Sequence, residues 1–128
     1  VIWWGHAKDV AASRAVMHNR AVKDEPPRLG TWAIERDGLV VGNGLLIRSE
    51  LGVEIGWHVV KGAQGQGVAT AAARRLMQHA KDVAVDVVVA AIIPVNVPSQ
   101  RVAQKLGLVV TGHCTKAGLF HDCWTGEP

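Results

Sequence analysis

The chain has 128 residues, of which 48% are hydrophobic and 20% are charged, and its formal net charge at pH 7 is +3. This size and composition fit one globular domain with a hydrophobic core and argue against a disordered chain. The lysines and arginines form no long run and the longest apolar stretch is Val87 to Ile93, so we expect neither a nucleic-acid partner nor association with a membrane.

The N-terminal part predicts a helix followed by strands. From about Lys8 to Arg20, apolar residues recur at helical spacing, and Val1 to Trp4 precedes them as a short strand or a loop. Three runs with the composition of strands follow, over 30–36, 39–48 and 53–60.

Glycines in this region predict how two of the strands meet. Asp37-Gly38, between the first two strands, is typical of a two-residue hairpin turn. Gly42 and Gly44 in the second strand indicate a bulge or a close approach of two backbones.

The C-terminal part predicts alternating helices and strands. Apolar residues recur every four positions from Val68 to Ala80, which predicts a helix over 67–82. A buried strand, a short helix and a terminal hairpin follow, over 85–93, 99–106, 108–113 and 119–124. This order of elements predicts an α+β fold with a mixed, mostly antiparallel sheet flanked by helices.

A glycine-rich turn, Gln64-Gly-Gln-Gly67, leads into the first of these helices. Its glycines let the backbone approach a ligand, and the first helical turn offers unpaired N–H groups and the positive end of the helix dipole, an arrangement that suits phosphate. The dinucleotide fingerprint fails because Thr70 stands in place of its third glycine, and the nucleotide P-loop fails because no lysine follows Gly67. A tight turn without a ligand is the alternative interpretation.

The spacing Gln64-x-x-Gly67-x-Ala69 resembles motif A of the GNAT acetyltransferase superfamily. Asn96-x-x-Ser99, followed by Lys105-Leu-Gly, is similar to motif B of the same family, in the form found in the branch that includes the ribosomal-protein N-terminal alanine acetyltransferases. Glu54-Ile-Gly-Trp-His is similar to a strand of that branch. The resemblance extends over residues 29 to 125.

The resemblance implies a GNAT-like fold that binds acetyl-coenzyme A (acetyl-CoA). The residues implied in gripping its pyrophosphate are Gln64, Gly65, Gln66, Gly67, Val68, Ala69 and Thr70. Trp57, His58 and Val59 would pair with the pantetheine arm like an added strand, and a backbone N–H near His58 or Val59 would bind the oxyanion. Asn96 would bind a pantetheine amide or, alternatively, cap the next helix.

This chain departs from the family pattern in two ways. Many GNAT enzymes use a tyrosine as general acid at the position where this chain has Ala103, and the chain contains no tyrosine. The first strand and first helix of the family are not recognisable, so we interpret the N-terminal strand and helix as missing. Those elements normally help to form the acceptor site.

Transfer of an acetyl group from a thioester to an amine needs a base, an oxyanion donor and a proton or hydrogen bond for the leaving thiolate. By resemblance Ser99 serves the thiolate, and helix capping is its alternative role. Glu54 is the candidate general base, directly or through a water, with a solvated strand carboxylate as the alternative. His58, on the same strand face, is a second candidate base or else a packed histidine.

The two cysteines, Cys114 and Cys123, do not form a disulfide framework, and no signal peptide is present, so we expect a reducing, cytoplasmic location. A disulfide across the terminal hairpin is geometrically possible but is not favoured there. We expect no metal site, because His113 and Cys114 point to opposite faces of a strand and a C-x-x-C spacing is missing.

Together these patterns predict a single domain over 1–128 that acts as an N-acetyltransferase. It would move an acetyl group from acetyl-CoA directly to a primary amine, which is either a protein N-terminus or a small molecule. The alternative is a non-catalytic acyl-CoA-binding module with the GNAT fold. We expect a monomer or a homodimer.

Overall fold

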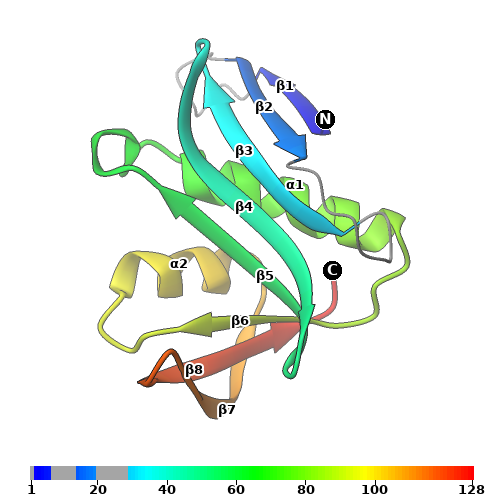
Figure 1. The fold of residues 1–128 in the computed structure, drawn as a ribbon, viewed down its shortest axis with the longest axis vertical. Helices are drawn as coiled ribbons and strands as arrows, with labels where there is room; N and C mark the ends of the chain where they lie inside the picture. Colours follow the sequence, from blue (N-terminus) through cyan, green and yellow to red (C-terminus); the bar gives the residue numbers. More distant parts are fainter. Residues whose placement is uncertain (1, 7–13, 20–28) are drawn as a thin grey trace.

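The computed structural model describes residues 2–6, 14–19 and 29–128. Its strands form one eight-stranded sheet in the order β1-β2-β3-β4-β5-β6-β8-β7 (Figure 1), in which only β5 and β6 pair in parallel. The strands are β1 (Ile2–His6), β2 (Arg14–Asn19), β3 (Gly30–Arg36), β4 (Leu39–Ser49), β5 (Gly52–Val59), β6 (Val88–Ile92), β7 (Val109–Lys116) and β8 (Leu119–Gly126). The predicted mixed, mostly antiparallel sheet is therefore confirmed.

Two α-helices among the described residues cover one face of this sheet. They are α1 (Val68–Asp82), which crosses behind β4 and β5, and α2 (Val97–Lys105), which lies against β6 (Figure 1). Ala72, Leu76 and Ala80 of α1 are fully buried and belong to one core cluster with Ile55 of β5 and Ile92 of β6. The four-residue spacing of α1 thus forms the apolar face that the sequence predicts.

The predicted helix from Lys8 to Arg20 is wrong where the structure describes that segment. Residues 14–19 form β2, which pairs antiparallel with β3 from Ala15↔Arg36 to Asn19↔Trp32. Hydrogen bonding to a neighbouring strand here overrides the helical spacing of the apolar residues. Residues 8–13 and 20 lie outside the described part, and β1 and β2 are the only regular elements among the described residues before Gly30.

The predicted hairpin turn and the predicted close approach of two backbones at Gly42 are confirmed. Asp37 and Gly38 have positive φ angles of 51° and 79°, as a type I′ turn requires. A Cβ atom at Gly42 would come within 2.0 Å of the carbonyl oxygen of His58, so β4 and β5 approach closely there. The register with β3 shifts at the same place, between Ile34 and Glu35.

The later elements differ from prediction mainly at their ends. The buried strand is shorter than 85–93, because residues 85–87 connect α1 to β6 instead of joining the sheet. The second helix begins two residues before Ser99, at Val97, because the side chain of Asn96 caps it. The terminal hairpin turns around Ala117 and Gly118, as expected.

Candidate active site

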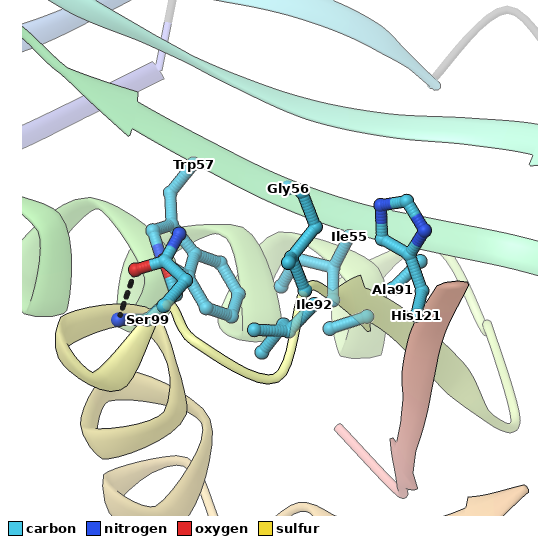
Figure 2. A pocket seen from close by; sticks show the side chains of 10 residues that line it. Ile55, Gly56, Trp57, Ala91, Ile92, Ser99 and His121 are labelled. Atoms are coloured by element: carbon cyan, nitrogen blue, oxygen red, sulfur yellow. Dashed lines mark hydrogen bonds between the residues drawn. The ribbon is translucent and has the colours of Figure 1, made fainter. Parts of the chain in front are cut away.

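The parallel strands β5 and β6 pair at only two positions, Val53↔Val88 and Glu54↔Val89. Beyond these positions each strand continues to pair only with its other neighbour, β4 or β8. Where the strands separate, a cavity of about 190 Å³ opens between them (Figure 2). Its lining residues are Ile55, Gly56, Trp57, Ala90, Ala91, Ile92, Ile93, Asn96, Ser99 and His121.

The side chains of β5 near this cavity point alternately to the two faces of the sheet. Ile55 belongs to the core under the helices, and Trp57 packs against that core. Side chains alternate along a strand, so Glu54, Gly56 and His58 belong to the opposite face, which carries no helix in the described part of the chain. A ligand between the strands would therefore have the helix-covered core on one side and the helix-free face on the other.

Ser99 and Asn96 bring the start of α2 to the cavity. Asn96 is the N-cap of α2, and its Oδ1 accepts a hydrogen bond from the Ser99 backbone N–H at 3.2 Å. The capping oxygen is thus that of Asn96, and the alternative role of Ser99 as the cap is excluded. Ser99 is half-buried and its side chain lines one end of the cavity (Figure 2).

The glycine-rich turn between β5 and α1 is exposed. Gly65 and Gly67 have φ angles of 74° and 79°, and Gly67 is the N-cap of α1, so no side chain caps the first helical turn. That turn also contains no acidic residue. The Gln64 side chain donates to the Val59 carbonyl at 2.9 Å, which ties the turn to the end of β5. The N–H groups of the helix start are thus presented at the surface.

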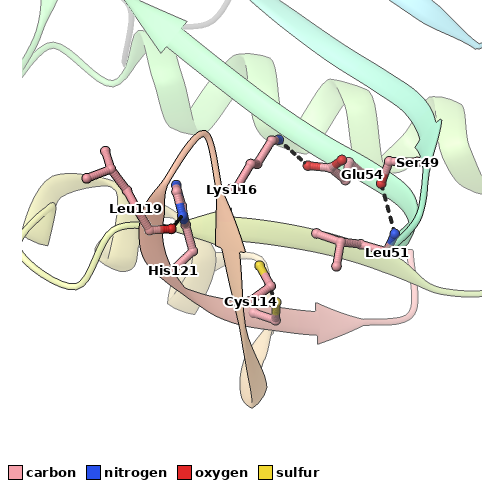
Figure 3. A network of polar contacts seen from close by, with 8 residues as sticks. Ser49, Leu51, Glu54, Cys114, Lys116, Leu119 and His121 are labelled. Atoms are coloured by element: carbon pink, nitrogen blue, oxygen red, sulfur yellow. Dashed lines mark hydrogen bonds and ion pairs between the residues drawn. The ribbon is translucent and has the colours of Figure 1, made fainter.

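Glu54 is buried, with 4% of its surface exposed, and Lys116 from β7 donates a hydrogen bond of 2.5 Å to its Oε1 (Figure 3). Burial raises the pKa of the Glu54 carboxyl, but hydrogen bonds from Lys116 and Ser49, the charge of Lys116 and the charge that His121 carries when protonated outweigh it, so its pKa lies below the usual 4.5. Glu54 is therefore a carboxylate held in an ion pair, and it is not among the residues that line the cavity.

The other candidates lie at different places around the cavity. Trp57 lines it, whereas His58 is exposed and does not, and Val59 is buried at the end of β5. The position of the family tyrosine holds Ala103, which is fully buried in the core and carries no ionisable group.

His121 is a cavity residue that the sequence analysis did not select. It lies in β8, is 9% exposed and faces the cavity at the end opposite Ser99 (Figure 2). The only local signal for it is a histidine within the predicted terminal strand. His121 lies near β5 because the strands are arranged in the order β5-β6-β8, and no short stretch of sequence reveals that order.

The family model of the Acetyltransferase (GNAT) domain matches residues 1–109. The chain belongs to the GNAT acetyltransferase family. The predicted family membership is thereby confirmed. The separated pair of parallel strands, the glycine turn and the start of α2 are therefore parts of a GNAT domain. No curated protein sequence gives a significant match.

Solved structures support the same fold for this GNAT domain. Mycobacterium smegmatis RimJ in complex with CoA-disulfide is 26% identical, with a TM-score of 0.70 over 78% of this chain and 53% of the RimJ chain. The structure of yncA from Salmonella typhimurium with its cofactor acetyl-CoA is 24% identical, with a TM-score of 0.68 over 77% of this chain and 64% of that one. The ribosomal-protein-S5-alanine acetyltransferase from Vibrio fischeri is 18% identical, with a TM-score of 0.69 over 77% of this chain and 61% of that one.

This GNAT domain spans between about half and two thirds of the length of these solved structures. Among its described helices, none has the length and apolar character needed to cross a membrane. The described residues contain no group of three or more side chains suited to hold a metal ion.

Proposed function

We propose that this chain transfers an acetyl group from acetyl-CoA to a primary amine by direct attack, without a covalent enzyme intermediate. The observation that carries the proposal is the separation of β5 from β6, which opens a cavity between parallel strands that ends at Ser99. Membership of the GNAT family supports it, as does the binding of CoA-disulfide and acetyl-CoA by RimJ and yncA.

The residues around the glycine turn fit the pyrophosphate of acetyl-CoA. The first turn of α1 has N–H groups without a side-chain cap, and it carries no acidic side chain that would repel phosphate. A Cβ atom at Gly65 would meet no other atom within 4 Å, so there is open space in front of this backbone. We therefore assign the pyrophosphate to Gln64–Thr70.

The pantetheine arm would run along the edge of β5 that turns away from β4. Beyond Glu54 this edge has no ladder partner among the described residues, so the backbone of Trp57–Val59 can pair with the amides of the arm. Asn96, at the start of α2, is the candidate side chain for a pantetheine amide, although its Oδ1 already caps the helix. The thioester would then lie in the cavity.

Ser99 is the group that we assign to the leaving thiolate. Its hydroxyl is not used for capping, it lies at the cavity, and the start of α2 favours negative charge in its neighbourhood. With alanine at the position of the family tyrosine, Ser99 takes the role of the proton donor.

The acceptor is a primary amine, and we favour a protein N-terminus over a small molecule. The support is the similarity to RimJ and to the ribosomal-protein-S5-alanine acetyltransferase from Vibrio fischeri. The splayed strands leave the helix-free face of the sheet open at the cavity, as a polypeptide end would require.

The proposal is tested with two measurements on the purified chain. Acetyl-CoA at about a hundred times its Kd should stabilise the fold by about 2.7 kcal/mol, seen as a higher Tm. Release of the CoA thiol should then depend on an added amine, either a peptide with a free N-terminal alanine or butylamine. Stabilisation without thiol release would favour the non-catalytic acyl-CoA-binding module, and no stabilisation would exclude both functions.

A further inference from the structure

His121 and Glu54 are buried polar side chains of the described residues, and they lie on the same side of the candidate site. His121 stands opposite Cys114 in the β7–β8 ladder, and Cys123, two residues on, stands opposite Ala91 of β6. Because side chains alternate, His121 shares its sheet face with Cys123 and Ala91. The proposed reaction leaves His121 without a role.

The hydrogen bonding of His121 determines which ring nitrogen carries the proton. Its Nδ1 lies 2.8 Å from the Leu119 carbonyl oxygen (Figure 3), and a carbonyl can only accept, so Nδ1–H is the donor. In the neutral imidazole Nε2 is then the basic nitrogen. No described residue forms a hydrogen bond with Nε2. The ring therefore presents an unused proton acceptor at the cavity.

We propose that His121 is the general base that accepts the proton of the acceptor amine. This assignment rests on the function proposed above, and it replaces Glu54 and His58 in that role. His121 and Ser99 lie at opposite ends of the cavity, with Ile55 and Ile92 between them (Figure 2). That separation suits a base for the attacking nitrogen and a proton donor for the leaving sulfur on two sides of one thioester.

The proton balance of the step is complete with these two residues. The neutral amine forms the new C–N bond as the C–S bond breaks, and His121 Nε2 takes the proton that the nitrogen loses. The thiolate takes a proton from the Ser99 hydroxyl, which regains one from water. His121 then returns its proton to water, so one proton enters and one leaves for each acetyl group transferred.

Charged neighbours of His121 support this role. The titratable groups on its side of the sheet are Glu54 and His58 from β5, Cys114 and Lys116 from β7 and Cys123 on its own strand. Glu54 is ionised, and its carboxylate is attracted by the charge of a protonated His121. A fixed carboxylate near the ring stabilises the imidazolium that forms in the transition state. We therefore regard Glu54 as a residue that acts through His121.

The matched test compares His121→Asn with His113→Asn. Asparagine keeps a donor for the Leu119 carbonyl but has no basic nitrogen, and His113 is an exposed histidine on β7, with 59% of its side chain accessible. We expect His121→Asn to lower kcat about 100-fold or more with little change in the Kd of acetyl-CoA, because general base catalysis contributes that much. His113→Asn should keep the kcat of the wild type.

The pH dependence distinguishes a base from a merely structural residue. Toward acid, kcat/KM falls for every variant because the acceptor amine is itself protonated. The wild type should fall more steeply, by one further proton, than His121→Asn, which has no basic nitrogen to protonate. If His121→Asn does not fold, His121→Gln and the wild-type profile replace it. Equal kcat for His121→Asn and His113→Asn, or equally steep pH profiles for the wild type and His121→Asn, would overturn the role of His121 alone. A wild type that binds acetyl-CoA but acetylates neither the alanine peptide nor butylamine would overturn the proposed function, and the base with it.

Discussion

The ammonium of Lys116 lies 2.5 Å from a carboxylate oxygen of Glu54, and this pair joins the tip of the terminal hairpin to the strand that lines the cavity (Figure 3). Glu54 is almost fully buried, whereas about half of the Lys116 side chain is exposed. The pair therefore bridges β7 and β5, which are not neighbours in the strand order of the sheet.

Replacement of Lys116 by Met should destabilise the fold by about 1–2 kcal/mol at pH 7, because a buried carboxylate loses its partner while water around the exposed position compensates in part. Urea unfolding of Lys116→Met and of Lys105→Met, which removes an exposed lysine of α2, measures the difference. Equal stability of the two variants would contradict the assigned pair.

The same pair predicts how stability changes with pH. The pKa of Glu54 is lower in the fold than its usual 4.5, so the ionised carboxylate stabilises the fold above that value. The contribution is lost as the pH falls through the folded-state pKa. The difference in unfolding free energy between wild type and Lys116→Met should therefore shrink below about pH 4. A constant difference from pH 7 to pH 3 would show that another interaction is responsible.

Two glycines form a matched pair for testing the proposed role of the Gln64–Gly67 turn in phosphate binding. Gly65 and Gly38 have φ angles of 74° and 79°, and an added Cβ atom meets nothing within 4 Å at either position. Alanine should cost about 1 kcal/mol of stability at both, because both need the left-handed conformation. Only Gly65→Ala should weaken acetyl-CoA binding, since its methyl group enters the space assigned to the pyrophosphate. Calorimetric titration checks this, and equal affinities would displace the pyrophosphate from the turn.

Ser99→Ala should lower kcat about tenfold or more while the Kd of acetyl-CoA changes little, because the hydroxyl acts on the leaving thiolate. Stability should be nearly unchanged, since Asn96 provides the cap of α2 through the Ser99 backbone N–H, which alanine keeps. Ser99→Thr retains a hydroxyl and should recover part of the activity. Steady-state kinetics with the alanine peptide measures the three proteins, and full activity of Ser99→Ala would remove Ser99 from the mechanism.

Cys123 should react slowly with alkylating reagents. Burial, the neighbouring Cys114 with its sulfur 3.2 Å away, and the nearby carboxylates raise the pKa of Cys123 from 9.0 to about 11. At pH 8 its thiolate fraction is then about 100-fold smaller than that of an ordinary cysteine. Mass spectrometry after brief treatment with iodoacetamide should find Cys114 modified before Cys123, and urea should abolish the difference. Equal labelling in the native protein would refute the shift.

Much of the fold could be predicted because its signals are local. The four-residue spacing of α1, the Asp37-Gly38 turn and the close-packed Gly42 each depend on neighbours in the chain, and the structure confirms them. Residues 14–19 were predicted wrongly because their strand exists through pairing with β3. The spacing of apolar residues indicates which secondary structure a segment favours in isolation. Pairing with a neighbouring strand can impose a different secondary structure.

The candidate site divides in the same way. The glycine turn and the Asn96-x-x-Ser99 sequence are contiguous motifs, so their positions at the helix starts could be read directly, and Asn96 proved to be the cap. The ion pair of Glu54 with Lys116 could not be predicted from the sequence, because the two residues come from strands far apart in the chain.

The sequence by itself determined the family and the two helix starts that we assign to the cofactor, since short motifs with fixed spacing encode both. Only the tertiary structure decided which side chains share the cavity. It placed His121 there and kept His58 out, because the order β5-β6-β8 and the early separation of β5 from β6 arise from long-range hydrogen bonding between strands.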